Sequence, residues 1–455
     1  MSAEGLRAAE EKMRRDAVPD PAIATFAHYY EQLEAGESGL IGEDEIDPVR
    51  DLPDAEALPD ADAPLDEAVV IKLNGGLGTS MGMSRAKSLL EVKEGLAFLD
   101  VIARQVLSLR AASGARLPLV LMDSFHTRDD SLALLEGYEG LASDVPFDFV
   151  QHKEPKLLVD GLAPAEWPAD PSLEWCPPGH GDIYPALLTS GMLATLLERG
   201  YRYAFMSNAD NLGAVLDPRI LAWVASEGLP YVAEVTERTP ADRKGGHVAR
   251  LKASGGLILR ETAQTSDADM DAFTDVDRHP YFHVNNLWVD LRALDTLLRE
   301  RDGVLGLPMI VNEKTVDPAD KSSPAVYQLE TAMGAAIGVF DGAQAIRVPR
   351  ARFVPVKKTS DLLVLRSDAY RLGEHAAIEL APSRSAPPLV ELSDDEFKLL
   401  GDFDARFPAG APSLVDAERL AVEGDVTFGR DVVVRGDVSV SGPRAVADGE
   451  VLQAE

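Results

Sequence analysis

The sequence of 455 residues has only one cysteine and no long apolar run. The single Cys176 excludes an intrachain disulfide, and a zinc site built on CxxC spacing is excluded with it. No stretch reaches the roughly 18 consecutive apolar residues that a membrane span needs. Residues 1–20 lack the apolar core of a signal peptide. We therefore expect a cytoplasmic protein that does not bind membranes.

Basic residues are also scarce, at 44 lysines and arginines against 76 acidic residues, for a net charge of -32. Binding to nucleic acid in general requires a basic surface that neutralises phosphates, so this balance argues against a nucleic-acid partner. Net charge otherwise affects solubility and association rather than fold. Any site for a polyanionic ligand must therefore gather its lysines locally, against the charge of the whole molecule.

The length predicts two or three domains, because single cores stop growing near about 250–300 residues. Apolar residues recur at helical spacing over residues 1–40, and an acidic stretch with several prolines follows over 42–66. We interpret that stretch as a linker. The expected division is a helical segment with its linker over 1–66, a main domain over 67–385 and a C-terminal domain over 386–455.

The main domain alternates short apolar runs with helical patterns. Strands are predicted at residues 68–73, 117–122, 147–150, 203–208 and 231–236, and helices at 98–110, 129–138 and 189–200. Such alternation implies crossover connections, and hence an α/β domain with a mostly parallel sheet covered on both faces. Ligands of such sheets bind at the carboxyl ends of the strands.

The C-terminal region has a different period, because apolar residues recur every six positions over residues 420–442. The two apolar rows and the matching turn glycines are Val426, Val432 and Val438, then Phe428, Val434 and Val440, and finally Gly424, Gly436 and Gly442. A six-residue period is typical of a β-helix, although a pair of antiparallel hairpins would give the same alternation. An open β-helix end exposes unpaired backbone, so this domain is a candidate contact in a homo-oligomer.

A glycine-rich segment, KLNGGLGTSMG at residues 72–82, follows the predicted strand 68–73. Glycines let the backbone approach a ligand and expose N–H groups to phosphate oxygens, although many such segments are only tight turns. The glycine spacing differs from GxGxxG, which disfavours a dehydrogenase, and Met83 stands where a Walker A loop would continue with lysine. Lys87 follows closely and could neutralise a phosphate.

Two further motifs carry polar side chains. In PPGHGD, residues 177–182, prolines and glycines form a rigid loop that presents His180 as a hydrogen-bond donor for a phosphate oxygen. In SNADN, residues 207–211, Asp210 comes at the carboxyl end of a predicted strand. Magnesium takes one or two carboxylates plus ligand phosphates, so Asp210 is a candidate Mg²⁺ ligand. An Asx-turn would explain the same residues equally well.

Lysines and asparagines beyond the midpoint complete the candidates. They are Lys244 before two glycines, the pair Asn285 and Asn286, and Lys357, which follows the apolar residues 353–356. In so acidic a chain, lysines beside apolar strand residues are candidates for a locally positive pocket.

Taken together, these segments resemble the eukaryotic-type UTP–glucose-1-phosphate uridylyltransferase family, in order from about residue 68 to 366. The matching segments include KLNGGLGTSMG, WCPPGHGDIYPALLTSGML, YAFMSNADNLGAVLD, EVTERTPADRKGG, VNNLWVDL, QLETAMGAAIGVF and RARFVPVKKTSDLLVL. The resemblance implies a Rossmann-like GT-A nucleotidyltransferase central domain with a C-terminal left-handed β-helix. It also implies the Mg²⁺-dependent, reversible transfer of the uridylyl group of UTP to glucose 1-phosphate, which gives UDP-glucose and pyrophosphate.

The resemblance assigns roles to individual residues. Nucleotide contacts are expected from Leu73, Asn74, Gly75, Gly76, Lys87, Gln151, Gly179, Asp210 and Lys357. Sugar-phosphate contacts are expected from His180, Asn208, Ala209, Lys244, Asn285 and Asn286. Catalysis would depend on Lys87, Lys357 and Asp210, with Asp210 on the metal. The chain departs from the family around Lys87 and after Gln151, but both of these residues are retained.

Two other interpretations compete with this one. The first is a uridylyltransferase that acts on galactose 1-phosphate, an N-acetylhexosamine 1-phosphate or several sugars; here the PPGHGD and NNLW segments favour the glucose enzyme. The second is a catalytically silent sugar-nucleotide-binding or scaffold protein, which predicts loss of Asp210 or the lysines. All of these residues are present.

Overall fold

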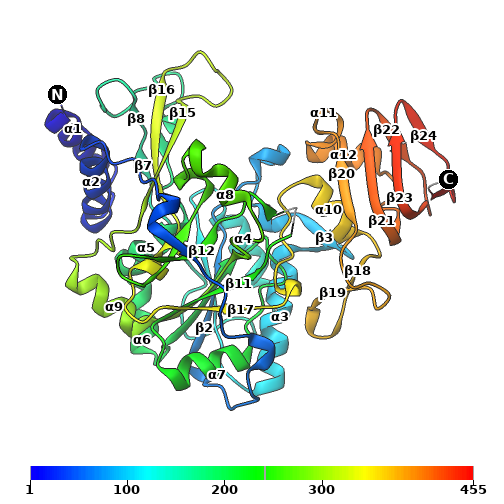
Figure 1. The fold of residues 1–455 in the computed structure, drawn as a ribbon, viewed down its shortest axis with the longest axis horizontal. Helices are drawn as coiled ribbons and strands as arrows, with labels where there is room; N and C mark the ends of the chain where they lie inside the picture. Colours follow the sequence, from blue (N-terminus) through cyan, green and yellow to red (C-terminus); the bar gives the residue numbers. More distant parts are fainter. Residues whose placement is uncertain (1, 240–241, 454–455) are drawn as a thin grey trace.

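The computed structural model describes residues 2–239 and 242–453, so Pro240 and Ala241 of the ERTPADRKGG segment lie outside the described residues. An N-terminal pair of helices and a C-terminal layer of strands flank a central α/β body (Figure 1). None of the helices in the described parts of the chain is long and apolar enough to span a bilayer.

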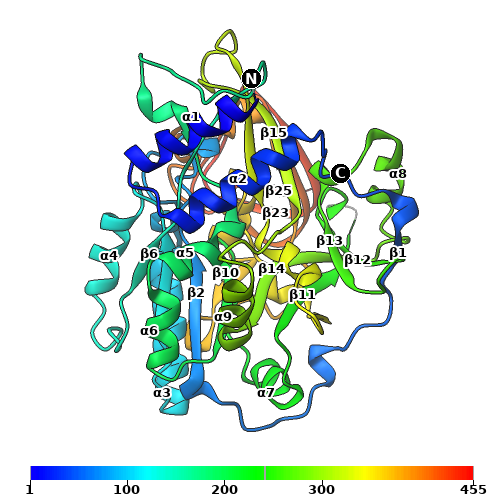
Figure 2. The same ribbon diagram turned by 90° about the vertical axis from the view of Figure 1, so that its left-hand side faces the viewer.

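The N-terminal helices α1 (Ser2–Arg15) and α2 (Asp20–Glu34) lie side by side next to strand β15 (Met309–Thr315), as Figure 2 shows. The apolar stripe read from the sequence is their contact face, since Met13, Phe26 and Tyr30 pack in one buried cluster with Leu157 and Leu329. The prediction that residues 1–40 are helical is therefore confirmed for these two segments.

The central sheet has ten strands. Seven form the path β1-β12-β14-β10-β2-β5-β6, and β11, β13 and β17 pair alongside it. Their bounds are β1 (Ile46–Pro48), β2 (Ala68–Leu73), β5 (Leu119–Asp123), β6 (Asp148–Val150), β10 (Tyr203–Asn208), β11 (Tyr231–Glu237), β12 (His247–Leu251), β13 (Leu257–Arg260), β14 (Tyr281–Asp290) and β17 (Gln344–Arg347).

The expectation of a mostly parallel sheet is wrong, because the sheet is mixed. Strands β10, β2, β5 and β6 are parallel, as expected for strands joined by helices. Strand β14 instead runs antiparallel to β10, β11 and β12. A short turn over residues 252–256 also joins β12 to β13 as an antiparallel pair. A helix over residues 218–227 does separate β10 from β11, but β14 pairs antiparallel with both of them, and strand–helix alternation along the chain does not reveal such a pairing.

Helices cover both faces of the sheet, as predicted (Figure 1). Alternate residues of β2 point to opposite faces, so Val70 packs in the core on the side of α3 (Phe98–Ser113). Its neighbours Val69 and Ile71 pack in the core on the other side. That second core contains α5 (Ile183–Thr189), α6 (Met192–Glu198) and α9 (Leu291–Glu300). The remaining helices are α4 (Arg128–Glu136), α7 (Pro218–Glu227), α8 (Met270–Thr274), α10 (Thr359–Arg366), α11 (Asp394–Phe397) and α12 (Leu400–Arg406).

The C-terminal strands pair in parallel. One sheet contains β20 (Leu389–Leu392), β21 (Ser413–Glu423), β23 (Val433–Ser441) and β25 (Val451–Gln453), and a second contains β22 (Val426–Phe428) and β24 (Arg444–Val446). Partners such as Leu420 and Val438 are 18 residues apart, which is three periods of six. Both predicted valine rows are buried. Parallel pairing rules out the hairpin alternative for these strands.

Smaller sheets join the rest of the chain. Their strands are β3 (Glu91–Lys93), β4 (Leu96–Ala97), β7 (Glu154–Pro155), β8 (Leu157–Leu158), β9 (Trp175–Cys176), β15, β16 (Ala325–Thr331), β18 (Tyr370–Leu372) and β19 (Ile378–Leu380). Of these, β9 directly precedes the PPGHGD loop in the chain, and the Thr331 backbone N–H at the end of β16 donates to Pro178 O in that loop at 3.0 Å.

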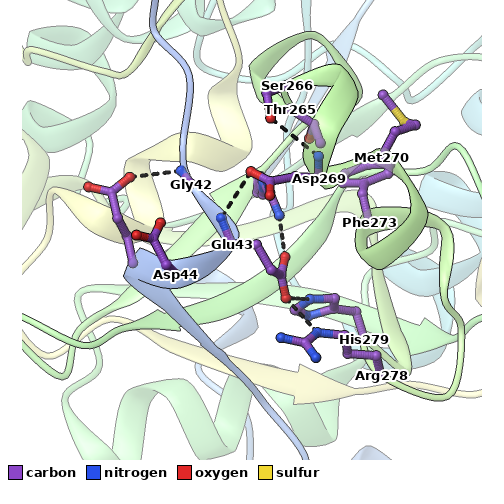
Figure 3. A network of polar contacts seen from close by, with 12 residues as sticks. Gly42, Glu43, Asp44, Thr265, Ser266, Asp269, Met270, Phe273, Arg278 and His279 are labelled. Carbon is purple, nitrogen blue, oxygen red and sulfur yellow. Dashed lines mark hydrogen bonds and ion pairs between the residues drawn. The ribbon is translucent and has the colours of Figure 1, made fainter.

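The acidic stretch over residues 42–66 is not a free linker, so that interpretation is corrected. Its β1 pairs with β12 at the edge of the sheet. The Glu43 carboxylate accepts hydrogen bonds from Arg278 Nε at 2.5 Å and His279 Nε2 at 3.0 Å, as Figure 3 shows. It also accepts one from Arg260 Nη1 at 2.5 Å. Asp269 accepts from the Glu43 backbone N–H at 3.1 Å. The Arg260 side chain is fully buried, so it needs carboxylates that composition alone does not reveal.

We expect Glu43→Gln to lower the free energy of unfolding by about 3 kcal/mol at pH 7, because Arg260 would keep a buried charge with one partner fewer. The matched control is Asp44→Asn at the exposed next residue, with an expected change within about 0.5 kcal/mol. Urea unfolding measures both variants, and equal effects at the two positions would contradict the role of Glu43.

The loss of stability in Glu43→Gln should be smaller at acidic pH than at pH 7. Burial alone would raise the pKa of Glu43, but hydrogen bonds from His279, Arg278 and Arg260 outweigh it and lower that pKa below its usual range. A depressed carboxyl pKa stabilises the fold above the unfolded-state pKa, and this stabilisation is lost as the pH falls through the folded-state value. The difference between wild type and Glu43→Gln should therefore shrink in acid.

Candidate active site

A cleft of about 300 Å³ opens at the carboxyl ends of β2 and β10. Eleven of the residues proposed from the sequence line it, namely Leu73, Asn74, Gly75, Gly76, Lys87, Gln151, Gly179, His180, Asn208, Ala209 and Asp210. The parallel register explains the convergence, since Leu73 at the end of β2 pairs with Asn208 at the end of β10. The two following loops therefore begin side by side at the same edge of the sheet.

The glycine-rich segment forms one wall of the cleft. A Cβ atom on Gly75 would lie 2.7 Å from Gln151 Oε1, so the absence of a side chain lets the Gln151 amide pack against this backbone in its present position. The Lys87 backbone N–H donates to Gly76 O at 3.0 Å, which ties Lys87 to the same loop. Gln151 and Lys87 thus contact two consecutive glycines of the same loop.

Asn74 lines the cleft, but its side chain anchors the loop. Its amide nitrogen donates to Asp123 Oδ1 at 2.6 Å and to Ser131 Oγ at 2.7 Å. Asp123 is fully buried, and Gln151 N donates to its backbone carbonyl at 2.8 Å. Asp123 therefore links the glycine loop to the segment that carries Gln151.

Lys87 and Asp210 form an ion pair across the cleft, with 2.6 Å between Lys87 Nζ and Asp210 Oδ2. Both side chains are mostly buried, at 18% and 23% exposed. The pair keeps two opposite charges in place in a chain with strong net negative charge. A phosphate can replace the carboxylate as partner of Lys87, and a cation can replace the ammonium as partner of Asp210. In the described residues, no group of three or more His, Cys, Asp or Glu side chains could hold a metal ion, and Asp210 is the one carboxylate among the residues that line this cleft.

His180 is set up as a hydrogen-bond donor. The Met333 backbone N–H donates to His180 Nδ1 at 2.9 Å, so this nitrogen carries no proton in the neutral ring. The proton of the neutral ring is then on Nε2. The protein packed around His180 lowers the pKa of its imidazole below the usual value, although the residue stays exposed at the cleft. His180 therefore stays neutral near pH 7 and can donate one hydrogen bond.

A bulge in β14 directs two asparagines to different places. Pairing with β11 shifts between Ala233 and Val235, and Asn285 has a left-handed φ of +60°. Asn285 Nδ2 donates to Asn208 Oδ1 at 2.9 Å, so Asn285 contacts a residue that lines the cleft. Asn286 is fully buried and donates to Glu234 Oε2 at 2.9 Å, away from the cleft.

The two remaining lysines differ in position. Lys357 is exposed beside the cleft, because the preceding Val356 N–H donates to Asp210 O at 3.2 Å. Lys244 is exposed on the turn before β12, where its carbonyl accepts a hydrogen bond from Thr262 Oγ1 at 2.7 Å. The structure therefore places the backbone before Lys357 next to Asp210, but neither Lys357 nor Lys244 is among the residues that line the cleft.

Sequence reasoning missed the buried charges beneath the site. Lys72 Nζ donates to Ser207 Oγ and to Ala214 O, both at 2.7 Å, and so spans the base of the loop that carries Asp210. Burial, with Arg352 nearby, lowers the pKa of Lys72 to about 7. Glu234 is fully buried, and Arg352 donates to it through two nitrogens at 2.8 and 2.6 Å. The available signal was a charged residue inside an apolar run, in AVVIKL and YVAEVT.

Asp123 yields a testable pH dependence. Burial raises its pKa to about 6, although hydrogen bonds from Asn74 and Thr127 partly offset this effect. A raised carboxyl pKa costs stability as the pH rises from the unfolded value toward the folded one, here by about 3 kcal/mol in total. Asp123→Asn retains an oxygen for Asn74 and removes that cost. In urea unfolding it should match wild type at pH 4 and exceed it at pH 8; lower stability at pH 8 would contradict the assignment.

Comparisons with known proteins agree with this geometry. A family model described as UTP–glucose-1-phosphate uridylyltransferase matches residues 23–435. The chain is 42% identical over 395 residues to the UTP–glucose-1-phosphate uridylyltransferase of Solanum tuberosum, which covers 85% of this chain and 80% of the relative. It is 41% identical over 378 residues to the Saccharomyces cerevisiae protein of the same name, with coverage of 83% and 74%.

A solved structure is also similar. It is a variant of UDP-glucose pyrophosphorylase from Leishmania major in complex with UDP-glucose, at a TM-score of 0.93 and 43% identity. The match covers 99% of this chain and 98% of that one, so the described α/β body and C-terminal strands both have counterparts. The chain belongs to the UTP–glucose-1-phosphate uridylyltransferase family.

Proposed function

We propose that this chain transfers the uridylyl group of UTP to glucose 1-phosphate and releases pyrophosphate, with UDP-glucose as the other product. The observation that carries the proposal is a single cleft that combines a glycine-rich backbone, Lys87, Gln151, His180 and Asn208 in a member of this family. Relatives with this activity in their names span most of the chain.

The contacts suggest where each part of the substrates binds. Gln151 next to Gly75 offers an amide for the edge of the uracil base. The Gly76 backbone and Lys87 would bind the phosphates of UTP, and His180 Nε2–H would donate to the phosphate of the sugar. Asn208 would contact the sugar hydroxyls.

The reaction joins two anions. An oxygen of the glucose 1-phosphate phosphate group attacks the α-phosphorus of UTP, the bond from that phosphorus to the bridging oxygen breaks, and pyrophosphate leaves. The nucleophile is already ionised near neutral pH, so no general base is required. Positioning and neutralisation of negative charge then supply most of the rate enhancement. Lys87 and Lys357 are the side chains proposed to supply that positive charge.

The residues present suit a magnesium ion. Asp210 offers one carboxylate at the end of β10, and substrate phosphates would provide further oxygen ligands, which is the donor set Mg²⁺ prefers. A bound Mg²⁺ would neutralise phosphate charge in the transition state. A cation held by Asp210 would compete with Lys87 for the carboxylate, which would leave Lys87 free to bind phosphate oxygens. Binding of cation and nucleotide would then be coupled.

We also propose the finer architecture implied by the family resemblance: a GT-A-like catalytic domain over 67–385 between an N-terminal segment over 1–66 and a C-terminal left-handed β-helix over 386–455. The 18-residue offset between parallel partners supports a coil of three six-residue sides. The same C-terminal domain remains our candidate for contact in a homo-oligomer.

The proposed activity is tested with a panel of sugar 1-phosphates. Purified protein with Mg²⁺ and UTP should release pyrophosphate fastest with glucose 1-phosphate, and UDP-glucose should form in equal amount. Galactose 1-phosphate and N-acetylglucosamine 1-phosphate are the competing substrates in the same assay. A faster rate with either would replace the sugar in the proposal, and no turnover with any of them would reject the activity.

Lys357→Ala is expected to lower kcat by about 100-fold or more, because a charge beside the transferred phosphate is lost. The side chain is exposed, so the midpoint of thermal unfolding should not change. Lys358→Ala is the matched control, since Lys358 is also exposed and its nearest carboxylate is Asp394 at 3.9 Å. Similar kcat values for the two variants would exclude a special role for Lys357.

Removing the metal is expected to abolish turnover. Treatment with a chelator should stop pyrophosphate release, and added Mg²⁺ should restore it. Asp210→Asn should raise the Mg²⁺ concentration needed for half-maximal activity by about tenfold or more, because the amide is a weaker ligand than the carboxylate. An unchanged Mg²⁺ requirement would mean that the cation binds elsewhere.

A further inference from the structure

His283 lies behind the cleft and has no role in the chemistry proposed above. Its Nε2 atom is 3.1 Å from Asn285 Oδ1. A Cβ atom on Gly334 would lie 2.3 Å from the same Nε2, so the backbone of η11 (Met333–Gly338) packs directly against the ring. The neighbouring Met333 N–H is the group that donates to His180. One short segment therefore contacts two imidazoles, that of His180, which lines the cleft, and that of His283, which does not.

The contacts of His283 form a directed chain of hydrogen bonds. Asn285 donates through Nδ2 to Asn208 Oδ1 at 2.9 Å, so its own oxygen must face His283. That oxygen accepts, so this chain of hydrogen bonds requires the His283 tautomer that carries its proton on Nε2. Burial lowers the pKa of His283 to about 4, so a neutral ring with a single proton makes this bond near pH 7.

The direction of these hydrogen bonds determines which atoms of the Asn208 amide face a ligand. Its Oδ1 is used by Asn285, so its amide N–H groups remain for the cleft that Asn208 lines. An amide without such a neighbour can rotate and offer either its oxygen or its nitrogen. Here the hydrogen bonds from His283 through Asn285 leave the Asn208 amide nitrogen to face the cleft.

The backbone gives independent support. Asn285 has a φ of +60°, a left-handed conformation that is costly for residues other than glycine and asparagine. The β14 bulge lies at the same place, opposite Glu234. A regular strand would direct the Asn285 and Asn286 side chains to opposite faces without this irregularity. The distortion brings Asn285 within hydrogen-bond distance of both His283 and Asn208.

We propose that His283 is a specificity-determining positioning residue, which acts through Asn285 to hold the Asn208 amide with its N–H groups toward the sugar hydroxyls. The proposal rests on the function proposed above and adds how the site distinguishes one sugar from its epimers. A donor held in one direction favours a hydroxyl that can accept at that position. A sugar whose hydroxyl points elsewhere leaves the donor without a partner, and this mismatch is the source of discrimination.

The first test compares two substitutions of His283. His283→Phe keeps a ring of similar size and removes the N–H donor, whereas His283→Gln keeps a donor that can reach Asn285. The measured quantity is the ratio of kcat/KM for glucose 1-phosphate to that for galactose 1-phosphate. We expect His283→Phe to lower this ratio about tenfold and His283→Gln to retain it within about threefold. The KM for UTP should stay within about twofold in both, because the nucleotide contacts are unchanged.

The second test reverses the direction of these hydrogen bonds and leaves His283 unchanged. Asn285→Asp replaces the amide donor by a carboxylate, which can accept from Asn208 but cannot donate to it. Asn208 would then turn its nitrogen away from the sugar and present its oxygen. We expect the glucose preference to fall about tenfold here as well. His126→Phe, at an exposed histidine outside the cleft, is the control and should leave the ratio unchanged.

The outcomes separate the two proposals. If the wild-type protein forms no UDP-glucose, the proposed function fails before His283 is considered. If wild type is active and His283→Phe retains the glucose preference with an unchanged unfolding midpoint, the role of His283 is overturned. If His283→Phe does not fold, Asn285→Asp decides alone: a retained preference overturns the proposal, and a lost preference with unchanged KM for UTP supports it.

Discussion

Parallel pairing of β2 with β10 is the interaction on which the rest of the site depends. It aligns Leu73 with Asn208, so the glycine-rich loop and the loop that carries Asp210 start together at one edge of the sheet. Everything proposed about substrate binding follows from this alignment, because Lys87 reaches Asp210 only when the two loops face each other. The antiparallel β14 then closes the other side of β10 and brings Asn285 to Asn208.

Buried polar groups hold these loops from below. Lys72 spans the base of the Asp210 loop, Asp123 joins Asn74 to the backbone before Gln151, and Glu234 binds Arg352. Each of these groups loses hydration when the chain folds, and each regains hydrogen bonds only if the loops adopt one arrangement. The same interactions therefore stabilise the fold and limit the positions that the cleft residues can take.

The net negative charge of the molecule explains why the cleft needs local hydrogen-bond donors and positive charge to bind anions. With a net charge of -32, the surface repels the anions that the family uses as substrates. The Lys87–Asp210 pair keeps a lysine ready inside the cleft without leaving an unbalanced buried charge. His180 contributes a neutral donor, which needs no counter-charge when the site is empty.

The sequence by itself determined the motifs, the strands at 68–73 and 203–208 and the period of six in the tail, because local apolar patterns and turn residues set these features. It also predicted eleven of the residues that line the cleft. Only the tertiary structure decided the mixed sheet, the folding of Glu43 onto Arg260, and the separation of Asn285 from its neighbour Asn286. These features depend on partners distant in the chain and on a bulge in β14, and neither leaves a periodic signal in the sequence.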